Sequence, residues 1–115
     1  MTLSDTVLEA IRGDDNFYDF DITGDLDAGD KIWFRAARKE SELNDTNALI
    51  KKGRNVAGQS GIADLNIGQG QFQVQLEPAD TATLTDKALV FHVVVQKADV
   101  NMDTTVAKGV IRLTE

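Results

Sequence analysis

Short segments in which apolar and polar residues alternate are the feature that most restricts how this chain can fold. The clearest is QFQVQLE at residues 71–77, where Phe72, Val74 and Leu76 alternate with glutamines and a final glutamate. A period of two places all three apolar side chains on the same face of a strand. The segment therefore predicts a strand with one buried face and one face in water.

The same kind of segment recurs along the chain, separated by clusters of turn residues. The predicted strands cover residues 18–23, 31–40, 48–52, part of 61–70, 71–77, 88–97 and 104–114. About seven short strands without long amphipathic helices between them argue against parallel crossover units. The predicted fold class is all-β, an antiparallel β-sandwich of immunoglobulin-like type, and a small barrel is the alternative.

The first residues carry a weaker signal. Ser4 is a suitable helix cap, and Val7, Leu8 and Ile11 would then lie close together on a short helix. An isolated helix of this length is only marginally stable, so an extended arm fits the segment equally well. We therefore expect residues 1–13 to form an N-terminal arm or short helix, and residues 14–115 to form a single sandwich domain.

Three positions allow more local predictions. Pro78, which is the only proline, ends the strand at 71–77 and suits the first position of one helical turn, with Asp80 near its start. Gly109 interrupts the last strand, which predicts a bulge or a close approach of another backbone. Trp33 stands next to Phe34, and because tryptophan often fills the core of immunoglobulin-like sandwiches, we expect Trp33 to be buried there. The alternative is that Trp33 is an exposed anchor for a partner.

The composition excludes several classes of function. Nineteen acidic residues against twelve basic ones give a net charge of −7, and the chain has no cysteine. A disulfide, a thiolate metal site and a cysteine nucleophile are therefore ruled out. The basic residues concentrate at only two places, which we interpret as solvated strand edges, so we expect no nucleic-acid binding. The alternative for these residues is a basic docking patch for an acidic partner. These residues are Arg35, Arg38 and Lys39, and then Lys51, Lys52 and Arg54.

No segment is suited to a membrane or to export. The apolar runs fall short of the roughly 18 residues of a membrane span. The first residues lack the basic leader and apolar stretch of a secretory signal, so we expect neither a membrane partner nor secretion.

The stretch from Asp19 to Asp30 could be taken for a calcium loop. It has acidic residues at its first, third, seventh, ninth and last places and Gly24 at its sixth. The flanking segments read as strands, however, and Asp19 and Asp21 would share a strand face that cannot curl round an ion. We favour a strand, a turn at Thr23-Gly24, a short acidic loop and a second strand, and leave weak calcium binding open.

Catalytic and cofactor motifs are weak. His92 is the only histidine and lies in an apolar strand, where a satisfied core or edge histidine is the simpler interpretation. The segment GQSG at 58–61 lacks the strand-to-helix setting of a nucleophile elbow. The segment GQG at 68–70 is far from a dinucleotide fingerprint and reads as a hairpin turn. We therefore expect no enzyme, no catalytic or metal residues and no cofactor.

Two segments of the chain form a distinctive combination, LEPADTATL at 76–84 and TVAKG at 105–109. Before them, in order, come IRGDD at 11–15, DITG at 21–24, KIWFRAARKE at 31–40 and SGIADL at 60–65. In this order the segments resemble those of small virion structural proteins encoded by tailed phages and prophages, which are similar to the immunoglobulin-like N-terminal domain of phage upper baseplate proteins. The chain departs from the pattern by the insertion DLDAGD at 25–30.

The resemblance implies a non-enzymatic structural role in the virion, as part of a tail, baseplate or neck or as a capsid decoration, after synthesis in the cytoplasm of the host bacterium. Its partners would be other virion proteins and copies of the same chain. We expect the N-terminal segment to provide the contact, through Leu3, Val7, Leu8 and Ile11. The alternative is a small carbohydrate- or ligand-binding sandwich module, for which the few aromatic residues offer a thin supply of contacts.

Overall fold

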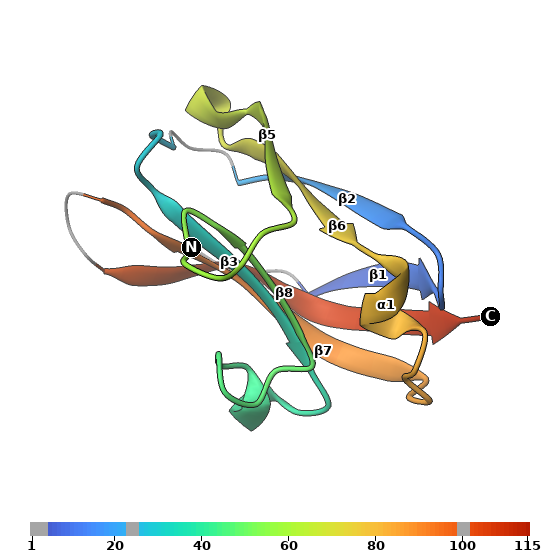
Figure 1. Ribbon diagram of the computed structural model, residues 1–115. Helices are drawn as coiled ribbons and strands as arrows, with labels where there is room; N and C mark the ends of the chain where they lie inside the picture. Colours follow the sequence, from blue (N-terminus) through green and yellow to red (C-terminus); the bar gives the residue numbers. More distant parts are fainter. Residues whose placement is uncertain (1–4, 23–25, 99–101) are drawn as a thin grey trace.

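The computed structural model describes residues 5–22, 26–98 and 102–115. Its strands form two packed sheets, which confirms the prediction of a mostly-β sandwich (Figure 1). The larger sheet contains β1 (Asp5–Ile11), β3 (Lys31–Ala37), β4 (Ile50–Arg54), β7 (Ala88–Gln96) and β8 (Asp103–Thr114), and the smaller contains β2 (Asn16–Asp21), β5 (Ile62–Asn66) and β6 (Gln71–Leu76). The strand orders are β1-β8-β7-β3-β4 and β2-β6-β5.

Little helix accompanies the strands. The helical segments of the described chain are η1 (Glu40–Glu42), η2 (Ile67–Gln69) and α1 (Pro78–Thr81). The helical turn predicted at Pro78 is confirmed, and the Asp80 carboxylate accepts a hydrogen bond from the backbone N–H of Glu77 at 2.7 Å, which closes a capping box. None of the helices in the described part of the chain is long and apolar enough to cross a membrane.

Phenylalanine rings join the two sheets. Phe20 stacks on Phe72 within the smaller sheet, and Phe34 stacks on Phe91 within the larger one, both with ring centroids 5.5 Å apart. Phe20 also lies against the two rings of the opposite sheet, at centroid distances of 6.3 and 6.4 Å. Phe72, Val74 and Leu76 are all fully buried, as their alternation predicts. The core is therefore built from the inward positions of the period-two segments.

The described part of the N-terminal segment forms a strand over Asp5–Ile11, so the helical alternative is wrong for these residues. β1 lies beside β8 and pairs with it in parallel from Asp5 opposite Lys108 to Ile11 opposite Thr114 (Figure 1). This pairing satisfies backbone groups that a short exposed helix would leave to water. It also makes the larger sheet mixed, so the prediction of a wholly antiparallel sandwich needs correction. In the sequence, β2 to β7 all lie between β1 and β8. They form the long connection that two parallel strands require.

Gly109 allows β1 to lie close to β8. Gly109 on β8 lies opposite Thr6, and a Cβ atom at this glycine would overlap the backbone of Thr6. The predicted close backbone approach is confirmed. The irregularity in the β7–β8 pairing lies elsewhere, between Val93 and Val94.

Trp33 does not fill the core, contrary to the prediction. Phe34 points inward and is fully buried, so the alternation along β3 places Trp33 on the outer face of the larger sheet. There the guanidinium carbon of Arg35 lies 5.3 Å from the centre of the Trp33 ring. Two adjacent aromatic residues on a strand cannot both face the core, and the larger sheet buries the phenylalanine.

The basic residues of β4 also differ from expectation. Lys51 is exposed, but Lys52 and Arg54 point inward and are only 7% and 8% exposed. Lys52 Nζ lies 2.6 Å from the Asp80 carboxylate, and Arg54 Nε lies 2.7 Å from the carboxylate of Asp64. The interpretation of this cluster as a solvated edge is therefore wrong for Lys52 and Arg54, because paired carboxylates make their burial tolerable.

Candidate functional site

The acidic side chains of the stretch from Asp19 to Asp30 that the structure describes do not surround a common point. Asp19 and Asp21 are exposed on β2, and their carboxylates accept hydrogen bonds from Gln73 at 2.9 Å and Gln71 at 3.2 Å. Asp30 points into the protein instead. Among the residues that the structure describes, no three histidine, cysteine, aspartate or glutamate side chains gather where they could hold a metal ion. The turn predicted at Thr23-Gly24 lies outside the described residues.

Asp30 holds together the loop in front of β3. Its buried carboxylate accepts hydrogen bonds from the backbone N–H groups of Asp27 at 2.8 Å and Ala98 at 2.9 Å, and Lys97 Nζ lies 2.7 Å away. Arg54 and Asn55 donate to the backbone carbonyl of Asp30 at 2.6 and 3.0 Å. Burial by itself raises the pKa of Asp30, but the hydrogen bonds from Lys97 and the two amides outweigh it and lower the pKa to about 2. Asp30 is thus a structural carboxylate.

A line of basic residues crosses the outer face of the larger sheet. Lys108 on β8 lies opposite His92 on β7, His92 lies opposite Arg35 on β3, and Arg35 lies opposite Lys51 on β4. We call these four residues the basic row. Basic side chains directly opposite each other destabilise a sheet, and this chain carries a net charge of −7. The basic row is therefore an unfavourable charge arrangement within the sheet, and we consider it as a candidate binding surface.

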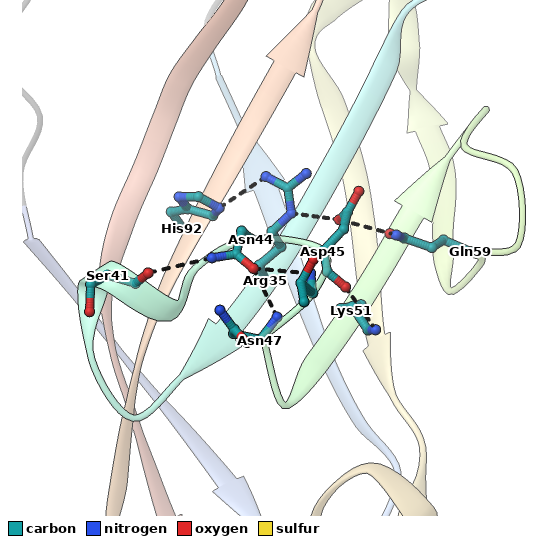
Figure 2. A network of polar contacts seen from close by, with 9 residues as sticks. Arg35, Ser41, Asn44, Asp45, Asn47, Lys51, Gln59 and His92 are labelled. Carbon is teal, nitrogen blue, oxygen red and sulfur yellow. Dashed lines mark hydrogen bonds and ion pairs between the residues drawn. The ribbon is translucent and has the colours of Figure 1, made fainter.

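Figure 2 shows how a loop residue, Asp45, partly neutralises the basic row. Arg35 Nε donates to the Asp45 carboxylate at 2.9 Å, and Gln59 donates to the same oxygen at 3.2 Å. The hydrogen bond from Arg35 holds the pKa of Asp45 below its ordinary value. Lys51 reaches only the backbone carbonyl of Asp45, at 3.1 Å. Arg35 thus has a carboxylate partner, whereas the ammonium group of Lys51 bonds to a neutral oxygen.

His92 lies half-buried in the middle of the basic row. Its Nε2 is 3.4 Å from Arg35 Nη1. Burial, and then the charge of Arg35, lower the pKa of His92 below its ordinary value of 6.5. The neutral imidazole can accept a hydrogen bond from Arg35 (Figure 2). In the described chain no carboxylate bonds to His92 and orients it as a catalytic base would require, so this arrangement favours a structural role.

The lowered pKa of His92 predicts a pH dependence of stability. At high pH the imidazole is neutral in both the folded and the unfolded protein. As the pH falls below 6.5, the unfolded chain takes up the proton first, so the free energy of unfolding decreases until the folded-state pKa is reached. We expect His92→Gln to lose less stability than the wild type between pH 7.5 and pH 5, measured by urea unfolding. Parallel losses in the two proteins would contradict this assignment.

A hollow of about 290 Å³ lies beside the basic row, over β7 and β8. Lys108 and His92 line it on one side, and Glu40 and Leu43, in and just after η1, line it on another. The remaining lining residues are Val90, Phe91, Thr105, Gly109 and Val110. Lys108 is exposed and makes no hydrogen bond or ion pair with the rest of the described chain. The hollow thus combines an unpaired cation with apolar side chains.

The second candidate surface is the free edge of β1, which carries predicted contact residues. Val7 and Ile11 are 56% and 48% exposed, whereas Leu8 packs against the core. The helical interpretation grouped Leu8 with Val7, but a strand places neighbouring residues on opposite faces. Leu3 lies outside the described residues. Whether Val7 and Ile11 contact a partner stays a prediction.

Side chains cover the free edge of β1 only at its end near Ile11. The side chain of Asn16 bonds to both the N–H and the carbonyl of Ile11 at 3.1 Å, and the Tyr18 hydroxyl donates to the carbonyl of Glu9 at 2.7 Å. The partial burial that accompanies this contact raises the pKa of Tyr18 to about 12. Since backbone groups alternate in direction along a strand, the N–H and carbonyl of Val7 point the same way as those of Ile11, away from β8. No side chain bonds to them in the described chain.

Comparison with known proteins adds no family. No protein-family model matches the sequence, and a search of curated proteins finds no significant match.

The basic row was missed from the sequence. Arg35, Lys51, His92 and Lys108 each lie in a predicted strand, but they come from four separate segments. Only the register between strands aligns them, and one residue of slip would separate them. The expected burial of Trp33 would also have placed Arg35 on the inner face.

Proposed function

We propose that this chain is a non-enzymatic structural component of a tailed-bacteriophage particle, in the tail, baseplate or neck or as a capsid decoration. It would act through contacts with other virion proteins after synthesis in the host cytoplasm. The assignment to a phage particle rests on the sequence resemblance. The observation that supports a contact function is the open part of the β1 edge, with exposed Val7 and unbonded backbone groups.

An open strand edge is a natural place for another chain to bind. Its backbone N–H and carbonyl groups can pair with an added strand, and proteins usually protect such edges. In this chain Asn16 and Tyr18 cover the end of β1 near Ile11 and leave Val7 open. This partial protection supports a short, specific contact rather than non-specific aggregation through the strand edge.

We also infer that the sandwich has immunoglobulin-like topology. In that fold one sheet contains the second, fifth and fourth strands side by side, and the other contains the third, sixth and seventh. If β1 is the first strand and β4 the additional edge strand of the variable type, then β2-β6-β5 and β8-β7-β3 have the required orders. The strand order therefore supports the inference, although Trp33 does not occupy the core.

Proline at position 7 tests the contact function. The N–H of Val7 points away from β8, so Val7→Pro should leave the β1–β8 pairing intact, as proline is tolerated on an edge with its nitrogen facing water. It removes the donor that an added strand would use. We expect Val7→Pro to fold like the wild type and to be at least about tenfold depleted from purified particles, measured by quantitative mass spectrometry.

Two controls make the result interpretable. Val7→Ile keeps the edge donor and should be incorporated normally. Deletion of residues 1–13 is less informative, because Ala10 is only 1% exposed and its loss would open the core. Normal incorporation of Val7→Pro would exclude the β1 edge as the contact, and absence of the wild-type protein from particles would contradict the virion role itself.

The alternative, a carbohydrate- or ligand-binding module, finds little support in the aromatic residues. Arg35 lies over the ring of Trp33, and Phe17 is isolated on the other sheet. The hollow beside Lys108 is the feature that favours it. Specific glycan binding by the isolated protein, lost in Lys108→Glu, would support this function.

A further inference from the structure

The two outer faces of the sandwich carry opposite kinds of residue. The outer face of the larger sheet has the basic row and the hollow. The outer face of the smaller sheet has a line of exposed residues along and just before β2, namely Asp15, Phe17, Asp19 and Asp21. We call these four residues the acidic stripe. The single chain therefore presents two surfaces that are complementary in charge.

The acidic stripe is held in place by β6. Gln75, Gln73 and Gln71 donate to the carboxylates of Asp15, Asp19 and Asp21 at 3.1, 2.9 and 3.2 Å. A carboxylate has about four acceptor sites, so the bonds to Asp15 and Asp19 leave these two carboxylates with capacity for a cation. The glutamines of β6 thus hold the carboxylates of the acidic stripe in position without preventing an ion pair with a basic side chain.

Phe17 is the apolar element of the stripe. It is 54% exposed, and Asp15 and Asp19 lie on either side of it. Side chains two residues apart on a strand are about 6.7 Å apart, so Phe17 projects between two carboxylates. An exposed aromatic side chain of this kind is typical of a contact anchor.

The hollow on the other face can receive such an anchor. Its volume of about 290 Å³ exceeds the roughly 150 Å³ that holds a benzene-sized molecule. Val90, Val110 and Leu43 supply apolar walls, and Lys108 supplies at the same place an ammonium group that pairs with no side chain among the described residues. Glu40 is the acidic residue of the lining, and by register Asp5 lies opposite Lys108 on β1.

We propose that a second copy of this chain is the occupant, with Phe17 in the hollow and a neighbouring carboxylate of the acidic stripe paired with Lys108. The other carboxylates would then face the rest of the basic row, whose members are about 4.8 Å apart on adjacent strands. Asp45 already pairs with Arg35 in one half of the row, so a carboxylate from a second copy would add negative charge in the other half, beside His92 and Lys108.

The geometry makes this contact directional. The two surfaces belong to opposite layers of the sandwich, so each copy can use one surface on each side, and the contact is heterologous and repeats from copy to copy. The net charge of −7 opposes association at long range, but at physiological ionic strength it is screened beyond about 8 Å. At contact distance, the complementary charges of the acidic stripe and the basic row then determine whether two copies associate.

This inference names the partner within the proposed contact function, but it does not involve the β1 edge. Its test uses purified full-length protein in solution. If the protein does not self-associate, this inference fails but the proposed function does not. The Val7→Pro experiment on incorporation into particles tests the proposed function separately.

The experiment exchanges charges across the contact and measures association by sedimentation velocity up to millimolar concentration. Wild-type protein should form species larger than dimers as concentration rises. Lys108→Glu and Asp19→Lys should each associate at least about tenfold more weakly, because like charges would face each other. Lys87→Glu, which makes the same charge change outside the basic row, should associate like the wild type.

Mixing the two single variants gives the decisive result. Asp19→Lys retains an intact basic face, and Lys108→Glu retains an intact acidic face. One native contact can therefore form between them, and the other pairing sets the substituted positions 19 and 108 against each other with opposite charges. An equimolar mixture should therefore regain the association that each variant alone has lost. Both substituted side chains are exposed, and circular dichroism should show unchanged folding.

Three results would overturn the proposal. The first is a wild-type protein that stays monomeric at every concentration. The second is a mixture of the two variants that behaves as the sum of its parts. The third is binding of duplex DNA by the basic row, abolished in Lys108→Glu, without any self-association, which would assign the row to a polyanion instead.

Discussion

Replacement of Asp30 with alanine is expected to lower the free energy of unfolding by about 3 kcal/mol, within the range for breaking a buried charge pair. The carboxylate is 1% exposed and accepts from two backbone amides and Lys97, all of which would lose this acceptor. The Lys97 side chain is 33% exposed and can recover water, which keeps the loss below the largest values for fully buried pairs. Urea unfolding at pH 7 measures the effect.

The matched control is Asp27→Ala. The Asp27 carboxylate lies 3.5 Å from the same lysine, but its side chain is 78% exposed. An exposed ion pair contributes little, so we expect a loss below about 1 kcal/mol. Equal losses in Asp27→Ala and Asp30→Ala would show that burial and the backbone hydrogen bonds of Asp30 are unimportant.

The pH dependence of this contribution follows from the lowered pKa. A carboxyl group with a folded-state pKa of about 2 and an ordinary value of 3.8 stabilises the fold above pH 3.8. That stabilisation is lost as the pH falls from 3.8 towards 2, because the carboxyl group of the unfolded chain takes up a proton before that of the folded protein does. The difference in stability between the wild type and Asp30→Ala should therefore shrink between pH 4 and pH 2.

Replacement of Gly109 with alanine is expected to detach β1 from β8. A Cβ atom at this position would overlap the carbonyl oxygen of Thr6, which is a backbone atom and cannot move without displacing the strand. We expect a loss of about 1–3 kcal/mol in the free energy of unfolding. In hydrogen exchange, the amides of β1 should lose protection while those of β3 and β7 keep most of theirs.

Gly68→Ala is the control for this substitution. Gly68 lies in η2, and a Cβ atom there would meet nothing within 4 Å. Its effect on stability should be within about 0.5 kcal/mol. Retained protection of β1 in Gly109→Ala would mean that the strand can shift at little cost, and would contradict the close approach as a requirement of the fold.

Alternation and turn residues were sufficient to predict the strands and much of the core. Phe72, Val74 and Leu76 are buried because a strand has a period of two whatever its neighbours are. Pro78 begins a helical turn because its ring already holds the required backbone angle. These properties depend on residues close together in the chain, so they can be recognised without knowledge of the fold.

Pairing partners and the choice between two plausible faces required the folded chain. Trp33 was expected in the core, but the packed sheets bury Phe34 instead. β1 became a strand because β8 offers it a partner at Gly109. The basic row likewise exists only through the register of four strands. The physical reason is that hydrogen bonds and side-chain contacts between distant segments set register and orientation, whereas periodicity within one segment does not depend on them.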